Sequence, residues 1–268
     1  MAERPKVYAF TSAIVRRPGA SVINGLQAVD GGIPSIDGVR AEHEAYIAGL
    51  KRAGVVVTVL EPLEAFPDSI FVEDPALVFG DTAILLHPGT ESRAGEVAAI
   101  APALREHFAT VMELGAGHVD GGDVLTTPDG VMIGLSARTD RQGAEALIDC
   151  LARMDRRGEI FHTPDGVLHF KSDCSLLDDT TVLSTERLAA SGVFERFRQI
   201  LAPVGEEAAA NALRVNDTVF VGDSYPRTIG LLRGKGYKVE PLPTSEIGKI
   251  DAGLSCMSLR WHAWPRGD

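Results

Sequence analysis

The chain has 268 residues, of which 45% are hydrophobic and 24% charged, and its net charge is −11. This composition is that of an ordinary globular protein and argues against disorder. No stretch approaches 18 consecutive apolar residues, which argues against a spanning helix, and the first ten residues lack the apolar core of a signal peptide. We therefore expect a cytoplasmic protein. An acidic surface favours neither a nucleic-acid nor a membrane partner, and suits a cationic small molecule better.

Three cysteines, Cys150, Cys174 and Cys256, show no CxxC spacing. An odd number of cysteines without a signal peptide indicates reduced thiols. The sequence contains neither a phosphate-binding loop nor a dinucleotide fingerprint, and its seven histidines are scattered. We therefore expect no cofactor and no metal.

One pattern recurs along the chain: two short apolar strands joined by a turn that contains an aspartate. The turn aspartates lie 48, 50 and 38 residues apart, at Asp81, Asp129, Asp179 and Asp217. Helical periodicity follows such hairpins, as in 92–108 and 139–154. After each predicted helix comes one more short strand, at 55–62, 110–115, 159–164 and 238–243. The repeating unit is therefore ββαβ.

A repeat of this length is typical of arrays and propellers. Four hairpins are visible, at 76–87, 123–136, 175–184 and 213–222, and the two ends, 7–19 and 253–261, are able to form a fifth unit. The sequence thus predicts an α/β fold of five ββαβ modules in a single domain, 1–268. A doubly wound α/β sheet is the alternative, but it requires single strands, not hairpins, before each helix.

Several carboxylates lie beside predicted strands. Asp68, Glu73 and Asp74 precede one of them and form either a solvated loop or a cation site. Asp120 and Asp123 flank a Gly-Gly pair, which forms either a simple turn or a point of close backbone approach. Taken alone, each group is more typical of a loop than of a site.

Other residues gain meaning only in combination. His169 ends an apolar run and Cys256 lies in a Gly/Ser-rich segment, while Cys150 is best explained as core. A thiol nucleophile needs a base or proton donor, as His169 offers, and an orienting carboxylate, as Asp120 offers. A guanidinium ligand needs planar carboxylates, and an amino-acid carboxylate needs an arginine such as Arg138, which follows a predicted strand.

Five segments together resemble the signature segments of the dimethylarginine dimethylaminohydrolases: FVED (71–74), GGDVL (121–125), GLSARTD (134–140), HFKS (169–172) and DAGLSCMSLR (251–260). That family belongs to the guanidino-group-modifying superfamily, whose pentein fold is a propeller of five modules. The resemblance runs from about residue 14 to residue 260, in the family's order. Arginine deiminases share the fold but usually carry an extra helical insertion, for which this chain has no room.

The resemblance implies a role for each matching residue. Cys256 matches the nucleophile, His169 the general acid/base, and Asp120 the acidic residue that orients the histidine, where some relatives have glutamate. The resemblance implies that the remaining matches bind substrate. Glu73 and Asp74 would bind the guanidinium, and Arg93 and Arg138 would bind the α-carboxylate. Asp68 and the carbonyls of Leu26 and Ile250 would bind the α-amino group.

The resemblance also implies a reaction. The chain is expected to hydrolyse Nω-methylated arginine, a small guanidino amino acid, to citrulline and a methylamine through a covalent cysteine thiouronium. Deimination of arginine or transfer of its amidino group on the same scaffold is one alternative, and a non-catalytic pentein that binds a macromolecule is another. We expect a monomer or a homodimer.

Overall fold

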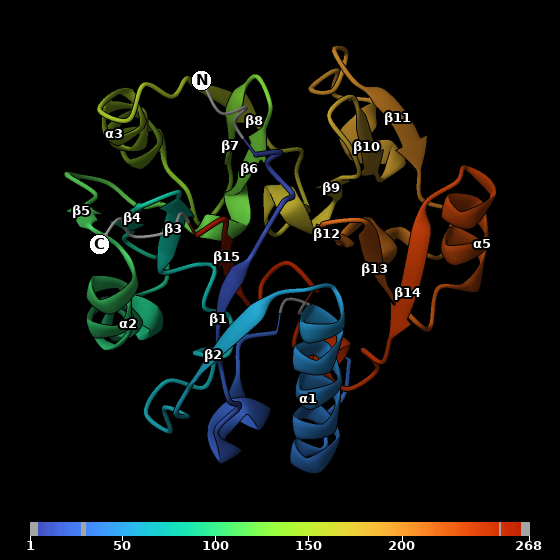
Figure 1. Cartoon of the computed structure of the whole chain (residues 1–268), viewed down its shortest axis with the longest axis horizontal. Helices are drawn as coiled ribbons and strands as arrows, with labels where there is room; N and C mark the ends of the chain where they lie inside the picture. The colour runs from blue at the N-terminus through green and yellow to red at the C-terminus, as the bar shows by residue number, and fades with distance from the viewer. Residues whose placement is uncertain (1–4, 28–30, 252, 264–268) are drawn as a thin grey trace.

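The computed structural model describes residues 5–27, 31–251 and 253–263. In this part of the chain, five separate three-stranded sheets surround a central axis, with helices at the periphery (Figure 1). No helix among the residues described has the length and apolar character needed to cross a bilayer.

All five sheets share one plan, in which the middle strand pairs antiparallel with the strand before it and parallel with the strand after it. The first sheet joins the two ends of the chain and contains β15 (Leu259–Trp261), β1 (Ser12–Arg16) and β2 (Val56–Leu60). The other four follow in chain order: β3 (Ala76–Phe79), β4 (Thr82–Leu85) and β5 (Thr110–Glu113); β6 (Val124–Thr127), β7 (Gly130–Leu135) and β8 (Gly158–His162); β9 (Cys174–Leu176), β10 (Thr181–Ser184) and β11 (Arg198–Leu201); β12 (Leu213–Val215), β13 (Thr218–Gly222) and β14 (Lys238–Leu242).

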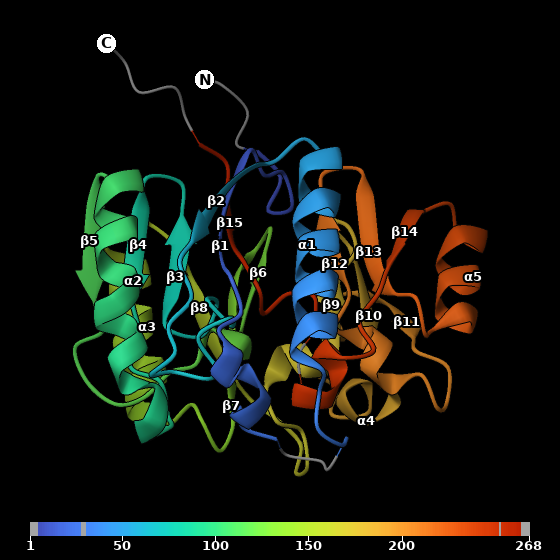
Figure 2. The same cartoon turned by 90° about the horizontal axis from the view of Figure 1, so that it is seen from below.

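A helix connects the middle strand of each sheet to its parallel neighbour. The helices are α1 (Ile36–Arg52), α2 (Ala94–His107), α3 (Arg141–Ala152), α4 (Glu186–Ala189) and α5 (Pro226–Gly234). Three begin at a side-chain cap, because Ser35, Asp140 and Thr185 each accept a backbone N–H of the first turn. In the perpendicular view, α2 and α5 lie at opposite edges of the molecule (Figure 2).

The hydrophobic core is divided among the boundaries between modules. Each of five buried clusters joins side chains of two neighbouring sheets; one, for example, combines Ile14 of β1 with Leu85 of β4 and Leu104 of α2. Cys150 lies in such a cluster, which confirms it as a core residue. Each module therefore buries its apolar surface only against its neighbours.

The predicted propeller of five ββαβ modules is confirmed, including the fifth module formed by the two chain ends. Two local predictions were incomplete. Residues 7–19 supply one strand, β1, because the residues before it form a turn. The module of β9 and β10 also contains β11 and the four-residue α4. The ββαβ repeat implied a helix and a strand there but did not locate them, since only Ile200 of β11 is buried and no apolar run marks that strand.

Candidate active site

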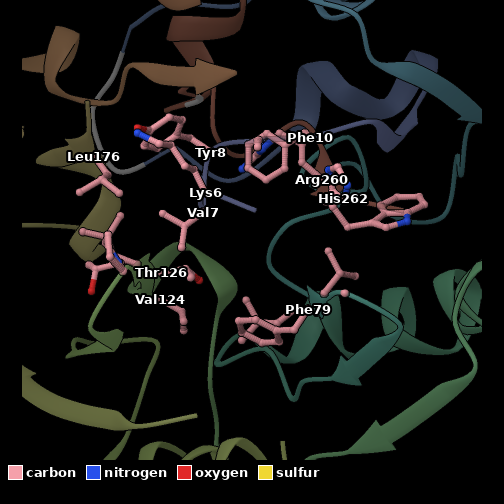
Figure 3. Close-up of a pocket in the computed structure, with 18 of the residues that line it drawn as sticks. Lys6, Val7, Tyr8, Phe10, Phe79, Val124, Thr126, Leu176, Arg260 and His262 are labelled. Carbon is pink, nitrogen blue, oxygen red and sulfur yellow. The ribbon is translucent and has the colours of Figure 1, made fainter. Parts of the chain in front are cut away.

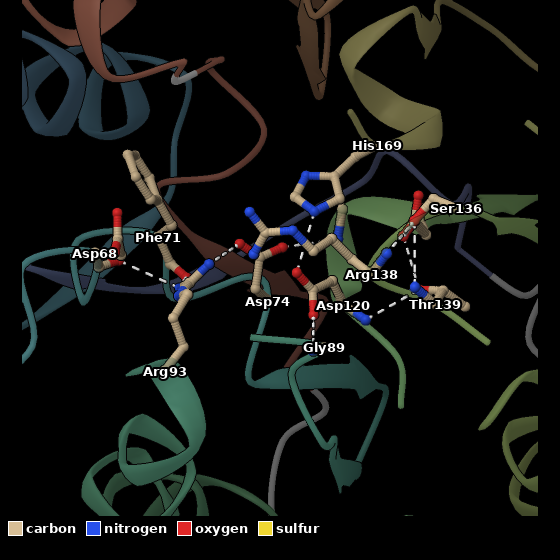
Figure 4. Close-up of polar contacts among 12 residues, drawn as sticks. Asp68, Phe71, Asp74, Gly89, Arg93, Asp120, Ser136, Arg138, Thr139 and His169 are labelled. Carbon is tan, nitrogen blue, oxygen red and sulfur yellow. Dashed lines mark hydrogen bonds and ion pairs between the residues drawn. The ribbon is translucent and has the colours of Figure 1, made fainter. Parts of the chain in front are cut away.

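The segment that leads into the first strand of each sheet carries one polar residue of the site. Asp74 precedes β3, Asp120 precedes β6, His169 precedes β9 and Cys256 precedes β15. The fifth such segment, before β12, carries Asn211. Because the sheets surround one axis, these five segments meet beside it. His169 contacts Asp120 (Figure 4), and Asn211 contacts Cys256.

A cavity of about 130 Å³ lies where these segments meet. Eight of the ten residues that the sequence pointed to line it: Leu26, Asp68, Asp74, Arg93, Arg138, His169, Ile250 and Cys256. Asp120 lies behind His169, and Glu73 lines a different cavity. Four lining residues were missed, namely Gln27, Phe71, Leu168 and Asp251, although Phe71 and Asp251 lie within the quoted motifs.

His169 and Asp120 form a buried acid–base pair. His169 lies just before the short 3-10 helix η4 (Phe170–Ser172), and its Nε2 is 3.1 Å from Asp120 Oδ2. The other oxygen of Asp120 accepts the Gly89 N–H at 2.7 Å. A Cβ at Gly122 would lie 2.8 Å from His169 Nδ1, so the Gly-Gly pair allows the imidazole to pack directly on the backbone. The aspartate therefore reaches the histidine in spite of its shorter arm.

The charge state of His169 follows from these neighbours. Burial alone would lower the pKa of the imidazole, but the hydrogen bond to Asp120 and the charges of Asp74 and Asp123 raise the pKa to about 9. The ring is therefore an imidazolium at neutral pH and is able to donate a proton.

Cys256 favours its neutral form, whereas His169 favours its charged form. Its Sγ lies 3.8 Å from Asn211 Nδ2, and its carbonyl accepts the Glu73 N–H at 3.2 Å. Burial, and then the negative charges of Glu73 and Asp74, raise the pKa of the thiol to about 11. The empty site thus holds a neutral thiol beside a protonated histidine.

Asp74 and Arg93 form a buried ion pair on the pocket wall. Asp74 accepts the Gly122 N–H at 2.9 Å and Arg93 Nη1 at 2.5 Å. Burial would raise the pKa of Asp74, but the charge of Arg93 outweighs it and holds that pKa below its usual range. Glu96 binds the other side of the guanidinium, with Nε–Oε1 at 3.0 Å and Nη2–Oε2 at 2.7 Å. Sequence reasoning missed Glu96, whose only signal is its position three residues after Arg93.

Arg138 differs from Arg93 in its surroundings. Its side chain is half-buried, extends into the pocket (Figure 4), and has no hydrogen bond or ion pair from its guanidinium to the rest of the described chain. Its backbone N–H donates to Ser136 Oγ at 2.9 Å, and this bond fixes the backbone from which the side chain extends. Arg138 is therefore available for an incoming anion.

Asp68 holds the loop that forms one side of the pocket. Its Oδ1 accepts the Leu26 N–H at 2.9 Å, and the next residue, Gln27, donates from Nε2 to the Lys249 carbonyl, also at 2.9 Å. Lys249 and Ile250 belong to the 3-10 helix η6 (Ile247–Ile250). The loop and η6 therefore meet across the cavity.

Glu73 lies apart from Asp74. It forms ion pairs with Lys171 at 2.6 Å and Arg260 at 3.1 Å, and it lines a second cavity of about 1070 Å³, which the N-terminal residues Lys6, Tyr8 and Phe10 also line (Figure 3). Its Oε2 has no partner among the residues described. Sequence reasoning missed both cations, although they lie inside the quoted segments HFKS and DAGLSCMSLR.

One group in the described residues has the spacing of metal ligands. Donor atoms of Asp74, Asp120 and His169 lie within 4.8 Å of one another. Each carboxylate already accepts hydrogen bonds, and the raised pKa of His169 keeps the ring protonated, a form that does not bind a metal. The donor set therefore fits an acid–base group better than a metal centre.

A comparison with known families and structures agrees with this geometry. A sequence model described as "Arginine deiminase" matches residues 66–208. The five-module fold and the pocket that holds a cysteine and a histidine point to the same class of protein. The chain is 37% identical over 254 residues to the N(G),N(G)-dimethylarginine dimethylaminohydrolase of Pseudomonas aeruginosa, covering 94% of this chain and all of the relative. It is 30% identical to the protein of that name from Streptomyces coelicolor, covering 92% and 96%.

A solved structure of the Pseudomonas aeruginosa enzyme, a cysteine-to-serine mutant complexed with citrulline, superposes with a TM-score of 0.91 at 36% identity, covering 94% of this chain and all of that one. The chain therefore belongs to the dimethylarginine dimethylaminohydrolase family.

Proposed function

We propose that this chain hydrolyses Nω-methylated arginine to citrulline and a methylamine, with Cys256 as the nucleophile. The observation that carries the proposal is the convergence of Cys256, His169 and Asp74 on one cavity with an unpaired arginine, Arg138, on its wall. These groups provide a nucleophile, a proton donor, a carboxylate that binds the substrate guanidinium and an arginine that binds the substrate α-carboxylate. The relative's complex with citrulline supports the choice of product.

Substrate binding comes first. The substrate guanidinium pairs with Asp74, and its α-carboxylate pairs with Arg138 and Arg93. The Leu26 and Ile250 carbonyls and Asp68 receive the α-amino group, while Glu73 adds negative charge behind the thiol. This arrangement holds the guanidinium carbon in line with the sulfur, so that much of the rate acceleration comes from positioning.

The chemical steps use the two protonation states described above. The bound cation favours release of the Cys256 proton to solvent, and the thiolate forms a C–S bond to the guanidinium carbon. His169 gives its proton to the departing methylamine as the C–N bond breaks, which leaves a thiouronium on the enzyme. Neutral His169 then takes a proton from water, and the hydroxide adds to the thiouronium carbon. The C–S bond breaks to release citrulline, and the departing thiolate takes the proton of the new hydroxyl group, which restores the neutral thiol. Asp120 stabilises the imidazolium before the amine departs and after the water is deprotonated.

The test is product analysis with arginine, monomethylarginine and asymmetric dimethylarginine, measuring citrulline together with ammonia, methylamine or dimethylamine. We expect the methylated substrates to give the higher kcat/KM, and Cys256→Ser to give no product. A preference for unmethylated arginine would indicate a deiminase. Binding of arginine analogues without turnover of any of them would contradict the hydrolase proposal altogether.

The cytoplasmic location, the single catalytic domain and the monomeric or homodimeric state stay predictions. Gel filtration with light scattering measures the last of these on the intact protein.

A further inference from the structure

One buried carboxylate has no part in the mechanism above. Asp123 lies in the 3-10 helix η3 (Gly121–Asp123), is fully buried, and does not line the pocket. It nevertheless accepts three short hydrogen bonds, from Ser136 Oγ and Thr139 Oγ1 at 2.7 Å each and from the Phe170 N–H at 2.8 Å. A buried charge needs such donors in order to persist, and these three come from two different parts of the chain.

The direction of the two hydroxyl bonds is fixed by the backbone. Ser136 Oγ accepts the N–H groups of Arg138 and Thr139, at 2.9 and 3.2 Å. Thr139 Oγ1 accepts the Asp120 N–H at 3.1 Å. Because each hydroxyl oxygen already receives an N–H, its own proton points to Asp123. Only a group that accepts and does not donate fits there, which is what an ionised carboxylate provides and an amide does not.

Each of these bonds ends beside a residue of the active site. Phe170 directly follows His169 in the chain, and the two hydroxyls hold backbone N–H groups of other site residues. Each donor of Asp123 is therefore connected to one site residue. Phe170 is bonded to His169 in the chain, Ser136 accepts the Arg138 N–H, and Thr139 accepts the Asp120 N–H.

We propose that Asp123 is a positioning residue that holds the proton donor His169, its partner Asp120 and the carboxylate-binding Arg138 in one fixed arrangement. Substrate recognition and proton transfer then depend on a single anchor outside the pocket. The charge of Asp123 also favours the protonated form of His169. The roles of His169 and Arg138 rest on the proposed function.

The experiment compares Asp123→Asn with the wild-type protein in two measurements. NMR titration of the His169 ring needs no substrate, and calorimetry with citrulline probes carboxylate binding. We expect the pKa of His169 to fall by roughly one pH unit and the Kd for citrulline to rise about tenfold, because the variant lacks the charge of Asp123 and its NH2 group cannot accept the bonds made to one of the two carboxylate oxygens. Glu206→Gln is the matched control. Glu206 is also a buried carboxylate that accepts a threonine hydroxyl, from Thr228 at 2.7 Å, but it does not line the pocket and should leave both values unchanged.

A folded Asp123→Asn variant with the wild-type His169 titration and citrulline affinity would overturn the proposal. If Asp123→Asn does not fold, Ser136→Ala decides. It removes the hydroxyl that holds the Arg138 and Thr139 N–H groups but leaves the bond from Asp123 to Phe170, so citrulline binding should weaken while the His169 titration stays. An unchanged citrulline affinity in Ser136→Ala would then overturn it. Failure of the proposed function shows separately, as absent turnover in wild-type protein whose His169 titration still responds to Asp123→Asn.

Discussion

Arg93 Nη1 lies 2.5 Å from Asp74 Oδ2, although both side chains are only 4% exposed. The family resemblance gives these two residues different ends of the substrate, the carboxylate to Arg93 and the guanidinium to Asp74. In the structure they bind each other, so Arg93 supplies Asp74 with the kind of cation that a substrate guanidinium would bring. Under the proposed function, substrate binding would require an exchange of partners at Asp74, during which Glu96 would keep Arg93 in place.

The two arginines should respond differently to mutation. Arg93→Ala leaves Asp74 and Glu96 buried without their cation, so we expect a loss of about 3–5 kcal/mol in the free energy of unfolding. Arg138→Ala removes a half-buried side chain without such bonds and should cost about 0.5 kcal/mol or less. Urea denaturation measures both values.

The two arginines should also make the enzyme select substrates that carry an α-carboxylate. The wild-type enzyme should process an agmatine-type substrate, which lacks the α-carboxylate, at least about tenfold less efficiently than the amino acid. Arg138→Ala should reduce this difference by raising KM for the amino acid alone. Equal kcat/KM values for both substrates in the wild-type enzyme would refute the assignment of both arginines.

The Cys256 thiol should ionise with the help of its substrate. Its pKa of about 11 in the empty site means that the free enzyme contains little thiolate at neutral pH. A bound guanidinium would offset the charges of Glu73 and Asp74 and lower that pKa. Ultraviolet absorbance of the thiolate against pH, with and without an unreactive guanidinium ligand, measures the change, with Cys256→Ser as the blank. A low pKa without ligand that the ligand does not move would show that the protein alone activates the thiol.

His169 predicts a dependence of stability on pH. Its pKa of about 9 in the folded protein exceeds the ordinary value of 6.5, so folding favours the protonated ring. This contribution, about 3 kcal/mol, is fully present below pH 6.5 and is lost as pH rises through about 9. Urea unfolding across that range should show a decline in the wild-type protein that is much smaller in His169→Gln. Parallel curves for the two proteins would contradict the raised pKa.

Mutation of His169 should affect formation of the covalent adduct less than complete turnover. His169→Gly should abolish turnover of methylarginine but still form a covalent adduct with S-methyl-thiocitrulline, whose leaving group is a thiol and needs no proton from histidine. A solved structure shows a His-to-Gly variant of a dimethylarginine dimethylaminohydrolase as an adduct with S-methyl-L-thiocitrulline. Mass spectrometry of the intact protein detects the adduct. Full turnover in the glycine variant would transfer the proton donor's role to another group.

Asn211 should assist the nucleophile. Its Nδ2 lies 3.8 Å from Cys256 Sγ and its Oδ1 accepts the Ser255 N–H at 3.2 Å, so it is placed to stabilise a thiolate. Asn211→Ala should slow alkylation of Cys256 by iodoacetamide roughly threefold to tenfold. Asn211→Asp keeps the acceptor for Ser255 but adds a negative charge, and should slow the reaction further. Wild-type rates in both variants would exclude this role.

The fold was predictable because the modules repeat in the sequence. The hairpins β3–β4, β6–β7, β9–β10 and β12–β13 each carry an apolar run with a turn aspartate, and this pattern depends only on neighbouring residues. The strand β11 was not predictable in that way, since three of its four residues are not buried. Its position depends on pairing with β10, which no local pattern in the sequence encodes.

The candidate site was predictable in its members but not in their pairing. Cys256, His169 and Asp74 lie in recognisable motifs, and the structure brings all three to one pocket. Glu73 illustrates the limit: two cations bind its carboxylate, and one of them, Arg260, lies 187 positions away in the sequence. Such a contact exists only after the modules have assembled, so residue type and spacing cannot reveal it.

The pairing of β15 with β1 has a consequence for how the protein is made. Because synthesis proceeds from the N-terminus, β1 leaves the ribosome before the other strands of the five sheets, and its antiparallel partner, three residues beyond Cys256, leaves after them. Four modules are thus synthesised in full, with Asp74, Asp120 and His169 present, before the nucleophile exists. A nascent chain that stalls before Cys256 carries the charges of the pocket but no thiol at its centre. The capacity for covalent chemistry therefore arrives with the same short segment that closes the ring.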